Sequence, residues 1–280
     1  MKTKINDKVI FKEFGGTGEL SRHLENAITQ EYFKGCAAGI EENDYRTEFT
    51  GTKTFKQAND FLNFGCIELQ KRIEKAGVAT MRARLNSFQN RRKVFSTVVG
   101  FAPNVPAYLA GTPNSMINVR QIRVRQRVLN FMYNTSVSWT VSAESIVKAA
   151  ANVVSAIMII EAGGVRVNVW TGEALKEDGC PDCLWLCKIK DSTQRMDTLK
   201  MAYPIAHPSM LRRHWFRLLE TTENVPSSYV NGYGTVINTE SRCMETLEKA
   251  GVNNIQRVLS FRDVDGKTPQ EIAHMILESK

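Results

Sequence analysis

Apolar and polar residues alternate along residues 121–128, and a mainly apolar run follows from Leu129 to Tyr133. Alternation with a period of two is typical of a half-exposed strand, and a continuous apolar run is typical of a strand covered on both faces. Residues 142–164 instead place apolar residues three and four apart, which predicts a long helix that begins at a serine cap. A second strand is expected over residues 165–174. This order of elements predicts a βαβ unit and therefore a parallel sheet.

The flanking segments extend this picture. Upstream, Leu20, Leu24 and Ile28 lie at helical spacing, and Thr54 with Gln57 forms a capping box before a further apolar stripe. Downstream, the pattern alternates between strands and helices up to the last residues. We therefore expect an α/β protein with a mainly parallel, Rossmann-like sheet flanked by helices. The expected domains are a helical amino-terminal region with a basic segment and a proline-rich loop, residues 1–118, packed on an α/β domain, residues 119–280.

The proline-rich loop, GFAPNVPAYLAGTPNSM, covers residues 100–116 and can be neither a long helix nor a central strand. Long irregular segments inside compact domains are often functional. Phe101 and Tyr108 lie in it between two basic clusters, where exposed aromatic side chains would stack on unpaired bases. Aromatic residues in such loops more often pin the loop to the core, and we favour this interpretation.

Charge is distributed unevenly along the 280 residues, which carry 37 Lys and Arg, 29 Asp and Glu and a net charge of +8. From Lys75 to Ala143 there is no acidic residue, and this window holds ten basic residues. Such a window is typical of a surface that binds a polyanion, because neutralised phosphates release their counterions. Pairing of these arginines with acidic residues elsewhere in the chain is the open alternative. The candidates for nucleic-acid contact in this window are Arg82, Arg84, Arg91, Arg92, Lys93, Arg120, Arg123, Arg125 and Arg127.

A second basic cluster lies in HPSMLRRHWFR, residues 207–217. Arg213 and Arg217 are four residues apart and share one face of the expected helix, opposite an apolar face. We include both among the candidates for nucleic-acid contact. The alternative is a solvated face on which they pair with Glu220 or Glu223.

Three cysteines have a spacing that resembles a metal site. Cys180, Cys183 and Cys187 give C-x₂-C-x₃-C, but a structural zinc site needs a fourth ligand and the candidates are far away in the sequence. Cys183 and Cys187 also differ by an even number along an expected strand, so they share a strand face. We therefore favour a hairpin turn with packed thiols over zinc.

Asn134, Ser136 and Ser138 alternate at the end of the first strand, where ligands bind in parallel sheets. This pattern, followed by an Ala/Val-rich helix and the strand GVRVNV, resembles the start of a von Willebrand factor A-type domain. In that family an Asp-x-Ser-x-Ser loop holds a divalent cation, usually Mg²⁺, with a later acid for which Asp263 is the best match. Asn134 replaces the first acid, and a neutral amide weakens a site for a hard cation. The resemblance implies a vWA-like domain over residues 119–280 with a degenerate, metal-free loop.

A wider resemblance covers most of the chain. The segments FTGTKTFKQANDFLNFGC, APNVPAYLAGTPNSM, NTSVS and AHPSMLRRHWFRLLE follow one another as in an uncharacterised family of phage and prophage proteins. The resemblance implies a viral or prophage origin and a location in the cytoplasm of the host cell. It implies no activity.

These features favour a binding protein over an enzyme. No carboxylate cluster, Ser-His-Asp set or Cys-His pair has the spacing of a hydrolase or nuclease. We expect a non-enzymatic phage accessory protein, without a cofactor or a membrane, that binds DNA, RNA or a nucleic-acid-associated protein through the acid-free segment. Two alternatives stay open. One is an interaction scaffold or homo-oligomeric assembly protein that uses the degenerate loop or the proline-rich loop, and the other is a metal-dependent enzyme acting on phosphates.

Overall fold

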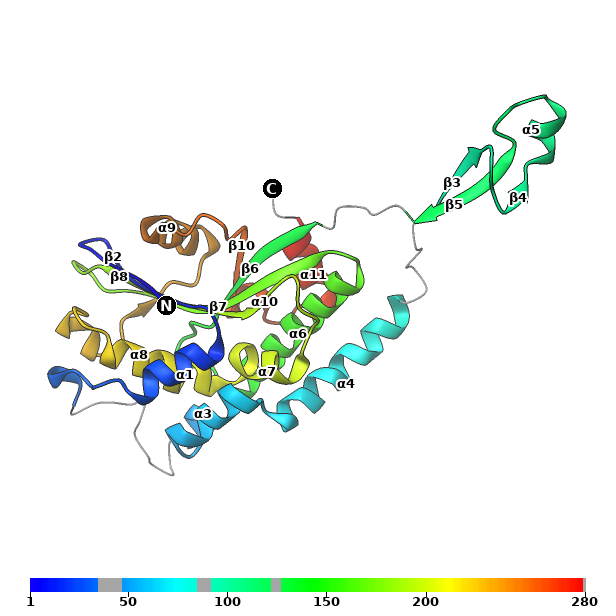
Figure 1. Ribbon diagram of the computed structural model, residues 1–280. Coiled ribbons are helices and arrows are strands. Elements are labelled where there is room, and N and C mark those ends of the chain that lie inside the picture. The colour runs from blue at the N-terminus through cyan, green and yellow to red at the C-terminus, as the bar shows by residue number, and fades with distance from the viewer. Residues whose placement is uncertain (35–46, 85–91, 122–126, 279–280) are drawn as a thin grey trace. The chain divides into compact units, whose positions relative to one another are not determined.

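The computed structural model divides the chain into two compact units (Figure 1). We call residues 1–81 with 128–280 the main unit and residues 82–127 the inserted unit. The expected domain boundary after residue 118 is wrong, because it falls inside a strand of the inserted unit, Met116–Gln121. The residues that the structure describes are 1–34, 47–84, 92–121 and 127–278.

A seven-stranded sheet forms the centre of the main unit, in the order β1-β2-β8-β7-β6-β10, and β9 pairs with the end of β7. β6 runs parallel to β7 and β10, and β2 runs parallel to β8, whereas β7 and β8 form an antiparallel hairpin. The predicted α/β fold, a mainly parallel sheet flanked by helices, is confirmed. The strands are β1 (Lys2–Ile5), β2 (Val9–Phe14), β6 (Val128–Asn134), β7 (Arg166–Lys176), β8 (Asp182–Lys190), β9 (Thr235–Val236) and β10 (Arg257–Ser260).

The amino-terminal strands depart from the sequence-based expectation, which was a mainly helical region. β2 is almost entirely buried and pairs with β8, so that Phe11 lies opposite Leu184. β1 covers the outer side of β2 in antiparallel register. The first residues of the chain therefore complete the sheet of the main unit instead of belonging to a separate helical region.

Helices cover both faces of this sheet (Figure 1). Cys183, Trp185 and Cys187 of β8 contribute to the core under the larger helical layer, whereas Leu184 and Leu186 contribute to the core under α9. This alternation is what a strand buried on both faces requires. The helices of the main unit are α1 (Thr17–Glu25), α2 (Thr47–Thr50), α3 (Phe55–Phe64), α4 (Ile67–Arg84), α6 (Ala143–Ala162), α7 (Thr198–Ala206), α8 (Phe216–Thr221), α9 (Glu240–Ala250), α10 (Phe261–Val264) and α11 (Pro269–Leu277), with a π-helical segment (Met210–Trp215) and 3-10 turns (Glu31–Phe33, Ser227–Val230).

The βαβ unit at the centre of the sheet was predicted correctly. Ser142 caps α6, and its hydroxyl accepts a hydrogen bond from the backbone N–H of Ser145 at 3.2 Å. α6 is long and apolar enough to cross a membrane by length and composition, but 67% of its most apolar window is buried inside the protein. This burial is the behaviour of a core helix, and α6 packs against α7 and α11.

The inserted unit is a three-stranded antiparallel sheet in the order β3-β5-β4, with one short helix. The proline-rich loop is therefore more regular than expected, because it contains β4 and α5. Asn104 caps α5, and Pro106 occupies its first turn, where a missing N–H costs nothing. The elements are β3 (Arg92–Thr97), β4 (Ala102–Pro103), α5 (Val105–Leu109) and β5 (Met116–Gln121).

Candidate nucleic-acid interface

The inserted unit concentrates the positive charge of the chain. It holds nine of the 37 basic residues and none of the 29 acidic ones, which leaves 28 basic and 29 acidic residues in the main unit. Arg82 and Arg84 lie in the last turn of α4, and Arg127 is exposed just before β6. Arg91, Arg123 and Arg125 lie outside the described residues. Nine of the ten basic residues in the acid-free window thus lie in one structural unit, whereas the end of the window, residues 128–143, belongs to the main unit.

The strands of this unit bring basic residues together. β3 begins with Arg92 and Lys93, and the register places Lys93 directly opposite Arg120 of β5. Like charges at opposite positions of an antiparallel pair destabilise it. An anion at this end of the sheet would relieve the repulsion.

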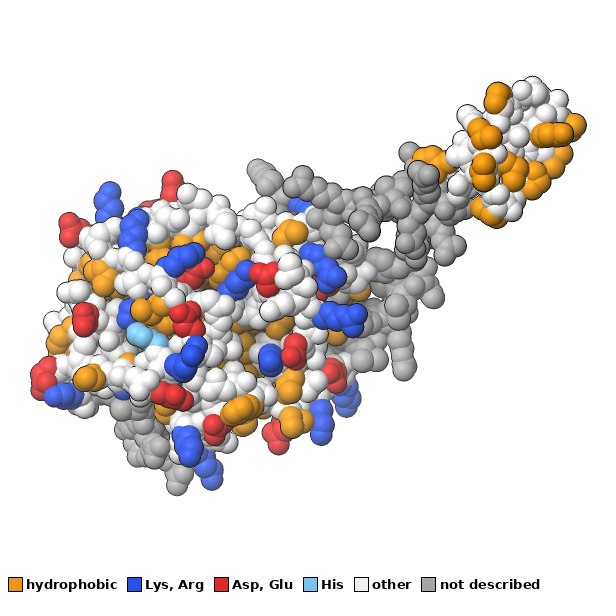
Figure 2. All heavy atoms as spheres, viewed as in Figure 1, with side chains coloured by type: hydrophobic (Ala, Val, Ile, Leu, Met, Phe, Trp, Pro, Cys, Tyr) orange, Lys and Arg blue, Asp and Glu red, His pale blue; other side chains and the backbone are white. Residues whose placement is uncertain are grey.

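The rest of the inserted sheet carries no charge. Residues 94–119, which we call the uncharged segment, contain no Asp, Glu, Lys or Arg. No side chain described between residues 94 and 118 is buried. Hydrophobic side chains accordingly gather on the visible face of this unit, whereas charged ones are spread over the main unit (Figure 2). The large hydrophobic residues that lie 57–79% exposed are Val94, Val98, Val99, Phe101, Val105, Tyr108 and Leu109.

The interpretation that Phe101 and Tyr108 pin a loop to the core is wrong. Phe101 is 72% exposed and Tyr108 is 71% exposed. The reason is architectural, because a three-stranded sheet with one short helix has no second layer that could cover these rings. Both aromatic rings are available to a partner.

Arg213 is not available to a nucleic acid, and its assignment to an anion-binding face is wrong. It is fully buried in the π-helical segment, and its Nε donates to the hydroxyl of Thr52 at 2.8 Å. Its Nη2 donates to the carbonyl oxygens of Thr52 and Lys53 at 2.8 and 3.0 Å. All six residues of this segment are buried, so the periodicity that predicted a surface helix does not apply.

Arg217 is also used inside the main unit, and its assignment as a nucleic-acid contact is wrong. Its Nη2 donates to the carbonyl oxygen of Ala27 at 2.6 Å, and its Nη1 lies 3.8 Å from a carboxylate oxygen of Glu220. Burial lowers the pKa of the Arg217 guanidinium, and the charge of Glu220 offsets part of this effect. The pairing with Glu220 that the sequence offered as the alternative is present, but in a buried setting.

Arg212 is a third buried arginine that the sequence analysis did not identify. It donates to the carbonyl oxygens of Phe49 and Val141, both at 2.7 Å, and its guanidinium lies 3.9 Å from the centre of the Phe49 ring. Burial lowers the pKa of this guanidinium to about 10. Arg212 therefore joins α2 and the loop before α6 to the π-helical segment.

The loop with alternating hydroxyl residues is closed by hydrogen bonds within the protein. Asn134 is fully buried, and its Nδ2 donates to the carbonyl oxygen of Ile237 at 2.6 Å. Ser136 is also buried, and its hydroxyl accepts a hydrogen bond from the N–H of Ala174 at 3.1 Å. β9 pairs with β7 just past the end of β6, at the edge where a ligand of a parallel sheet would bind. Ser138 alone of the three is exposed.

The later acid of the proposed metal loop has another role. Asp263 accepts hydrogen bonds from the N–H of Ser260 at 2.8 Å and from its hydroxyl at 2.7 Å, so it forms the capping box of α10. Within the described residues, no group of three or more His, Cys, Asp or Glu is placed to hold a metal ion.

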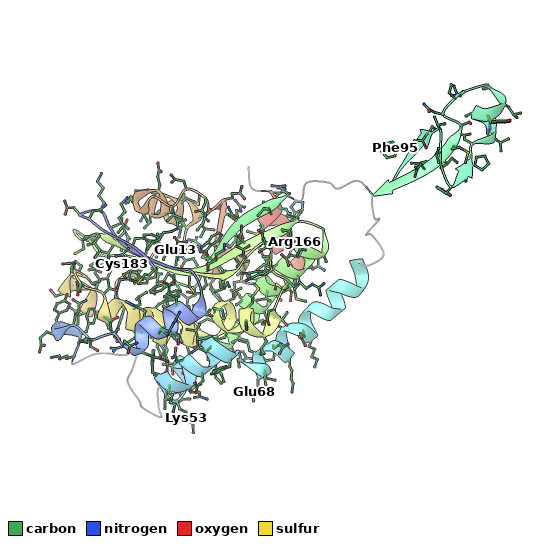
Figure 3. The ribbon with its side chains drawn as sticks, in the orientation of Figure 1. Glu13, Lys53, Glu68, Phe95, Arg166 and Cys183 are labelled. Carbon is green, nitrogen blue, oxygen red and sulfur yellow. The ribbon has the colours of Figure 1, made fainter. Side chains whose placement is uncertain are left out.

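The three cysteines lie in the β7–β8 hairpin, one in its turn and two in its second strand, as the spacing predicted. Cys183, labelled in Figure 3, and Cys187 are buried on the same face of β8, and burial raises the pKa of both thiols. Cys180 lies in the turn, with its Sγ 3.1 Å from the hydroxyl of Ser228. The predicted hairpin and shared strand face are confirmed.

Glu173 is a buried acid that the sequence analysis did not identify. It is fully buried on β7, opposite Trp185 of β8. Neither carboxyl oxygen of Glu173 nor the indole N–H of Trp185 has a hydrogen-bond partner in the described part of the chain. Burial raises the pKa of the Glu173 carboxyl well above its usual range. The sequence could have indicated this buried acid, because Glu173 is the single acidic residue in the otherwise mainly apolar strand β7.

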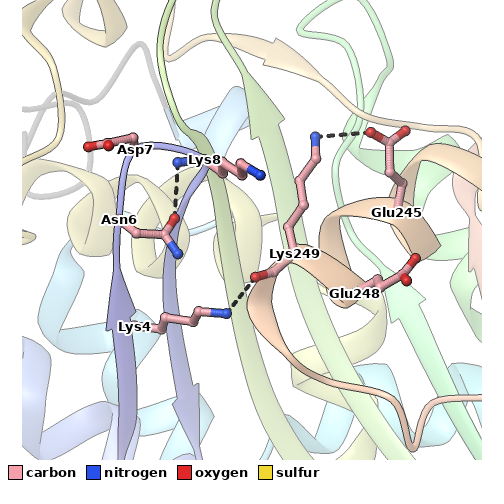
Figure 4. Close-up of a pocket in the computed structure, with 7 residues that line it drawn as sticks. All are labelled: Lys4, Asn6, Asp7, Lys8, Glu245, Glu248 and Lys249. Atoms are coloured by element: carbon pink, nitrogen blue, oxygen red, sulfur yellow. Dashed lines mark hydrogen bonds and ion pairs between the residues drawn. The ribbon is translucent and has the colours of Figure 1, made fainter.

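A charged hollow of about 540 Å³ lies between the β1–β2 hairpin and α9 (Figure 4). Lys4 donates to the carbonyl oxygen of Lys249 at 2.7 Å, and Lys249 lies 3.1 Å from Glu245. Basic and acidic residues are present here in equal number. The hollow therefore lacks the excess of positive charge that would attract a polyanion, which the inserted unit has. Its lining residues are Lys4, Asn6, Asp7, Lys8, Glu245, Glu248 and Lys249.

Comparison with known families places the whole chain in one group. The model of a domain of unknown function, DUF7192, matches residues 2–277. The chain belongs to this family. The range matched by DUF7192 includes the inserted unit as well as the main unit. The comparisons with curated proteins and with solved structures returned no match.

Proposed function

We propose that this protein is a non-enzymatic phage or prophage accessory protein that binds nucleic acid through its inserted unit. The observation that carries the proposal is the segregation of charge, with nine basic and no acidic residues in residues 82–127. The main unit is close to neutral by comparison. The opposed positions of Lys93 and Arg120 add a physical reason, because a bound phosphate would relieve their repulsion.

Binding of this kind is dominated by counterion release. Each phosphate that a Lys or Arg neutralises frees condensed cations, so the logarithm of affinity falls linearly with the logarithm of salt concentration. If several of the nine residues contact phosphates, the plot of log affinity against log salt concentration is steep. Each phosphate neutralised on duplex DNA contributes about −0.9 to the slope of this plot. Arginine, which predominates here, suits bidentate contacts to phosphates.

The test is a salt titration of affinity for labelled single- and double-stranded DNA and RNA. Arg92→Glu combined with Lys93→Glu is expected to weaken binding at least about tenfold at low salt and to reduce the slope. The matched control is Lys71→Glu combined with Arg72→Glu, two adjacent exposed basic residues of α4 in the main unit. An equal loss in both pairs would show a non-specific charge effect and would contradict the proposal.

A second candidate function is protein–protein assembly, which the exposed uncharged segment favours. The degenerate loop and the proline-rich loop were the two expected docking sites for this function, and Asn134 and Ser136 of the degenerate loop are buried and hydrogen-bonded. The assembly surface is therefore proposed in the inserted unit, which contains the proline-rich loop.

A further inference from the structure

Within the described residues 92–121, the inserted sheet has no second layer packed on it. A sheet with an apolar face must bury it against another element, and small units seldom supply that element themselves. Here, no described side chain of the uncharged segment is buried, and Val99 and Leu109 are 78% and 79% exposed. Large hydrophobic patches of this kind mark interaction surfaces.

The size of the patch matches a protein interface. The seven exposed hydrophobic residues of the uncharged segment offer roughly 800 Å² of accessible surface, which is what each partner contributes to a standard interface. The register places Val94, Ala102 and Ile117 on one face of the sheet, so part of this surface is a strand face suited to packing on another sheet.

The composition of the patch favours a second copy of this chain as the partner. Five of its seven residues are aliphatic, and aliphatic side chains offer no π-face on which a nucleic-acid base could stack. The uncharged segment lacks acidic and basic residues alike, so it carries no charge pattern that would select a foreign partner by complementarity. Two identical uncharged faces meet without like-charge repulsion, and each copy lacks the layer that the other provides.

We propose that two copies of this chain associate through their inserted units, uncharged segment against uncharged segment. The interface is isologous, so that the same residues of both copies meet around a twofold axis. The basic residues of β3 and β5 lie outside this contact and stay available to a polyanion. The proposal does not depend on the proposed nucleic-acid function.

The test is sedimentation velocity of the full-length chain, freed of nucleic acid, from about 1 to about 100 µM and in low and about 1 M salt. We expect a dimer that persists in high salt, because apolar association is not screened. Val99→Lys combined with Leu109→Lys is expected to raise the dissociation constant at least about tenfold. Both residues are exposed, so the variant is expected to keep the circular dichroism spectrum of the wild type.

The matched control is Ile28→Lys combined with Trp139→Lys, which places the same two charges on residues of the main unit that are 85% and 80% exposed. This variant is expected to dimerise like the wild type. A monomer at all concentrations, a dimer that dissociates in high salt, or a dimer unaffected by the two lysines would overturn the proposal. Binding of the monomer to anionic phospholipid vesicles, lost on Leu109→Lys, would assign the surface to a membrane and would also overturn it.

Lysine is chosen over an acid so that the two proposals separate. Val99→Lys and Leu109→Lys add positive charge, so they leave the electrostatic attraction to nucleic acid in place. If the double lysine variant is monomeric but still binds nucleic acid in a salt-dependent way, both proposals are supported. A salt-resistant dimer without nucleic-acid binding would leave the dimer standing and contradict the proposed function.

Discussion

Lys93 of β3 and Arg120 of β5 are direct partners in an antiparallel register, so two residues of like charge occupy opposite positions on one sheet. Like charges at opposite positions destabilise the pairing of the two strands, whereas opposite charges at the same positions would stabilise it. The proposed nucleic-acid function gives this arrangement a role, because a bound phosphate would relieve the repulsion. The buried charges of the main unit, by contrast, have a structural role.

Reversing the charge of Lys93 is expected to separate stability from binding. Lys93→Glu places an acid opposite Arg120, which stabilises the strand pair by about 0.2–1 kcal/mol. The same change removes a phosphate contact, so nucleic-acid affinity falls several-fold and the salt slope decreases by about one. Hydrogen exchange of the β3 amides and a salt titration of binding measure the two effects. Weaker binding together with faster β3 exchange would indicate that Lys93→Glu only unfolds the unit.

Removing Arg213 is expected to destabilise the main unit. Arg213→Ala leaves the carbonyl oxygens of Thr52 and Lys53 without their donor inside the core, which costs at least about 3 kcal/mol. Nucleic-acid affinity per folded molecule is expected to be unchanged, because the side chain is fully buried. Thermal unfolding and binding measured well below the transition check this. A specific loss of affinity at normal stability would contradict the buried role.

The buried carboxyl of Glu173 is expected to make the stability of the protein depend on pH. Because its pKa is raised in the folded state, the folded protein keeps a proton that the unfolded chain loses above about pH 4.3. The free energy of unfolding therefore falls as pH rises above that value, by at most about 1.4 kcal/mol per pH unit from this group. Glu173→Gln removes this dependence and raises stability at neutral pH.

The measurement for Glu173 is denaturant unfolding from about pH 5 to about pH 8, compared with Glu68→Gln at an exposed position of α4. The control is expected to follow the wild type. An unchanged pH profile in Glu173→Gln would show that the carboxyl titrates normally and would contradict this account.

Restoring the acid of the metal loop is expected to harm the protein. Asn134→Asp replaces an amide that donates to the carbonyl oxygen of Ile237 with a group that is an acceptor when ionised. The resulting repulsion in a buried site costs about 2–4 kcal/mol. Millimolar Mg²⁺ is expected to leave the unfolding temperature of this variant unchanged. Stabilisation of Asn134→Asp by Mg²⁺, but not of the wild type, would instead reveal a latent cation site.

Local patterns in the sequence were enough to predict the centre of the fold. Three consecutive elements form this centre: the apolar run ending at Tyr133, the capped helix α6 and the strand β7. Each could be predicted from the periodicity of its own residues, without knowledge of distant partners. The β7–β8 hairpin was equally local. β2 was missed because its partner β8 is distant in the sequence, and a strand without a visible partner cannot be told from other short apolar runs.

The candidate site was misjudged where it depended on burial. The basic residues of the acid-free window could be listed from the sequence, because charge content needs no knowledge of the fold, and nine of the ten lie in one structural unit. Arg213 and Arg217 were misplaced because helical periodicity was taken to mean a surface helix. The π-helical segment that holds Arg213 is buried on all sides, and Arg217 is buried in α8. Exposure of Phe101 and Tyr108 depends on a missing second layer, which no local pattern records.

The most direct test of the central claim is the affinity of the purified full-length chain for a labelled duplex and a labelled single strand, measured from low to physiological salt. The account predicts binding that weakens steeply and linearly on logarithmic axes, with a shallower slope for Arg92→Glu combined with Lys93→Glu. Affinity that is absent, or that stays flat across this salt range, would contradict nucleic-acid binding by the inserted unit.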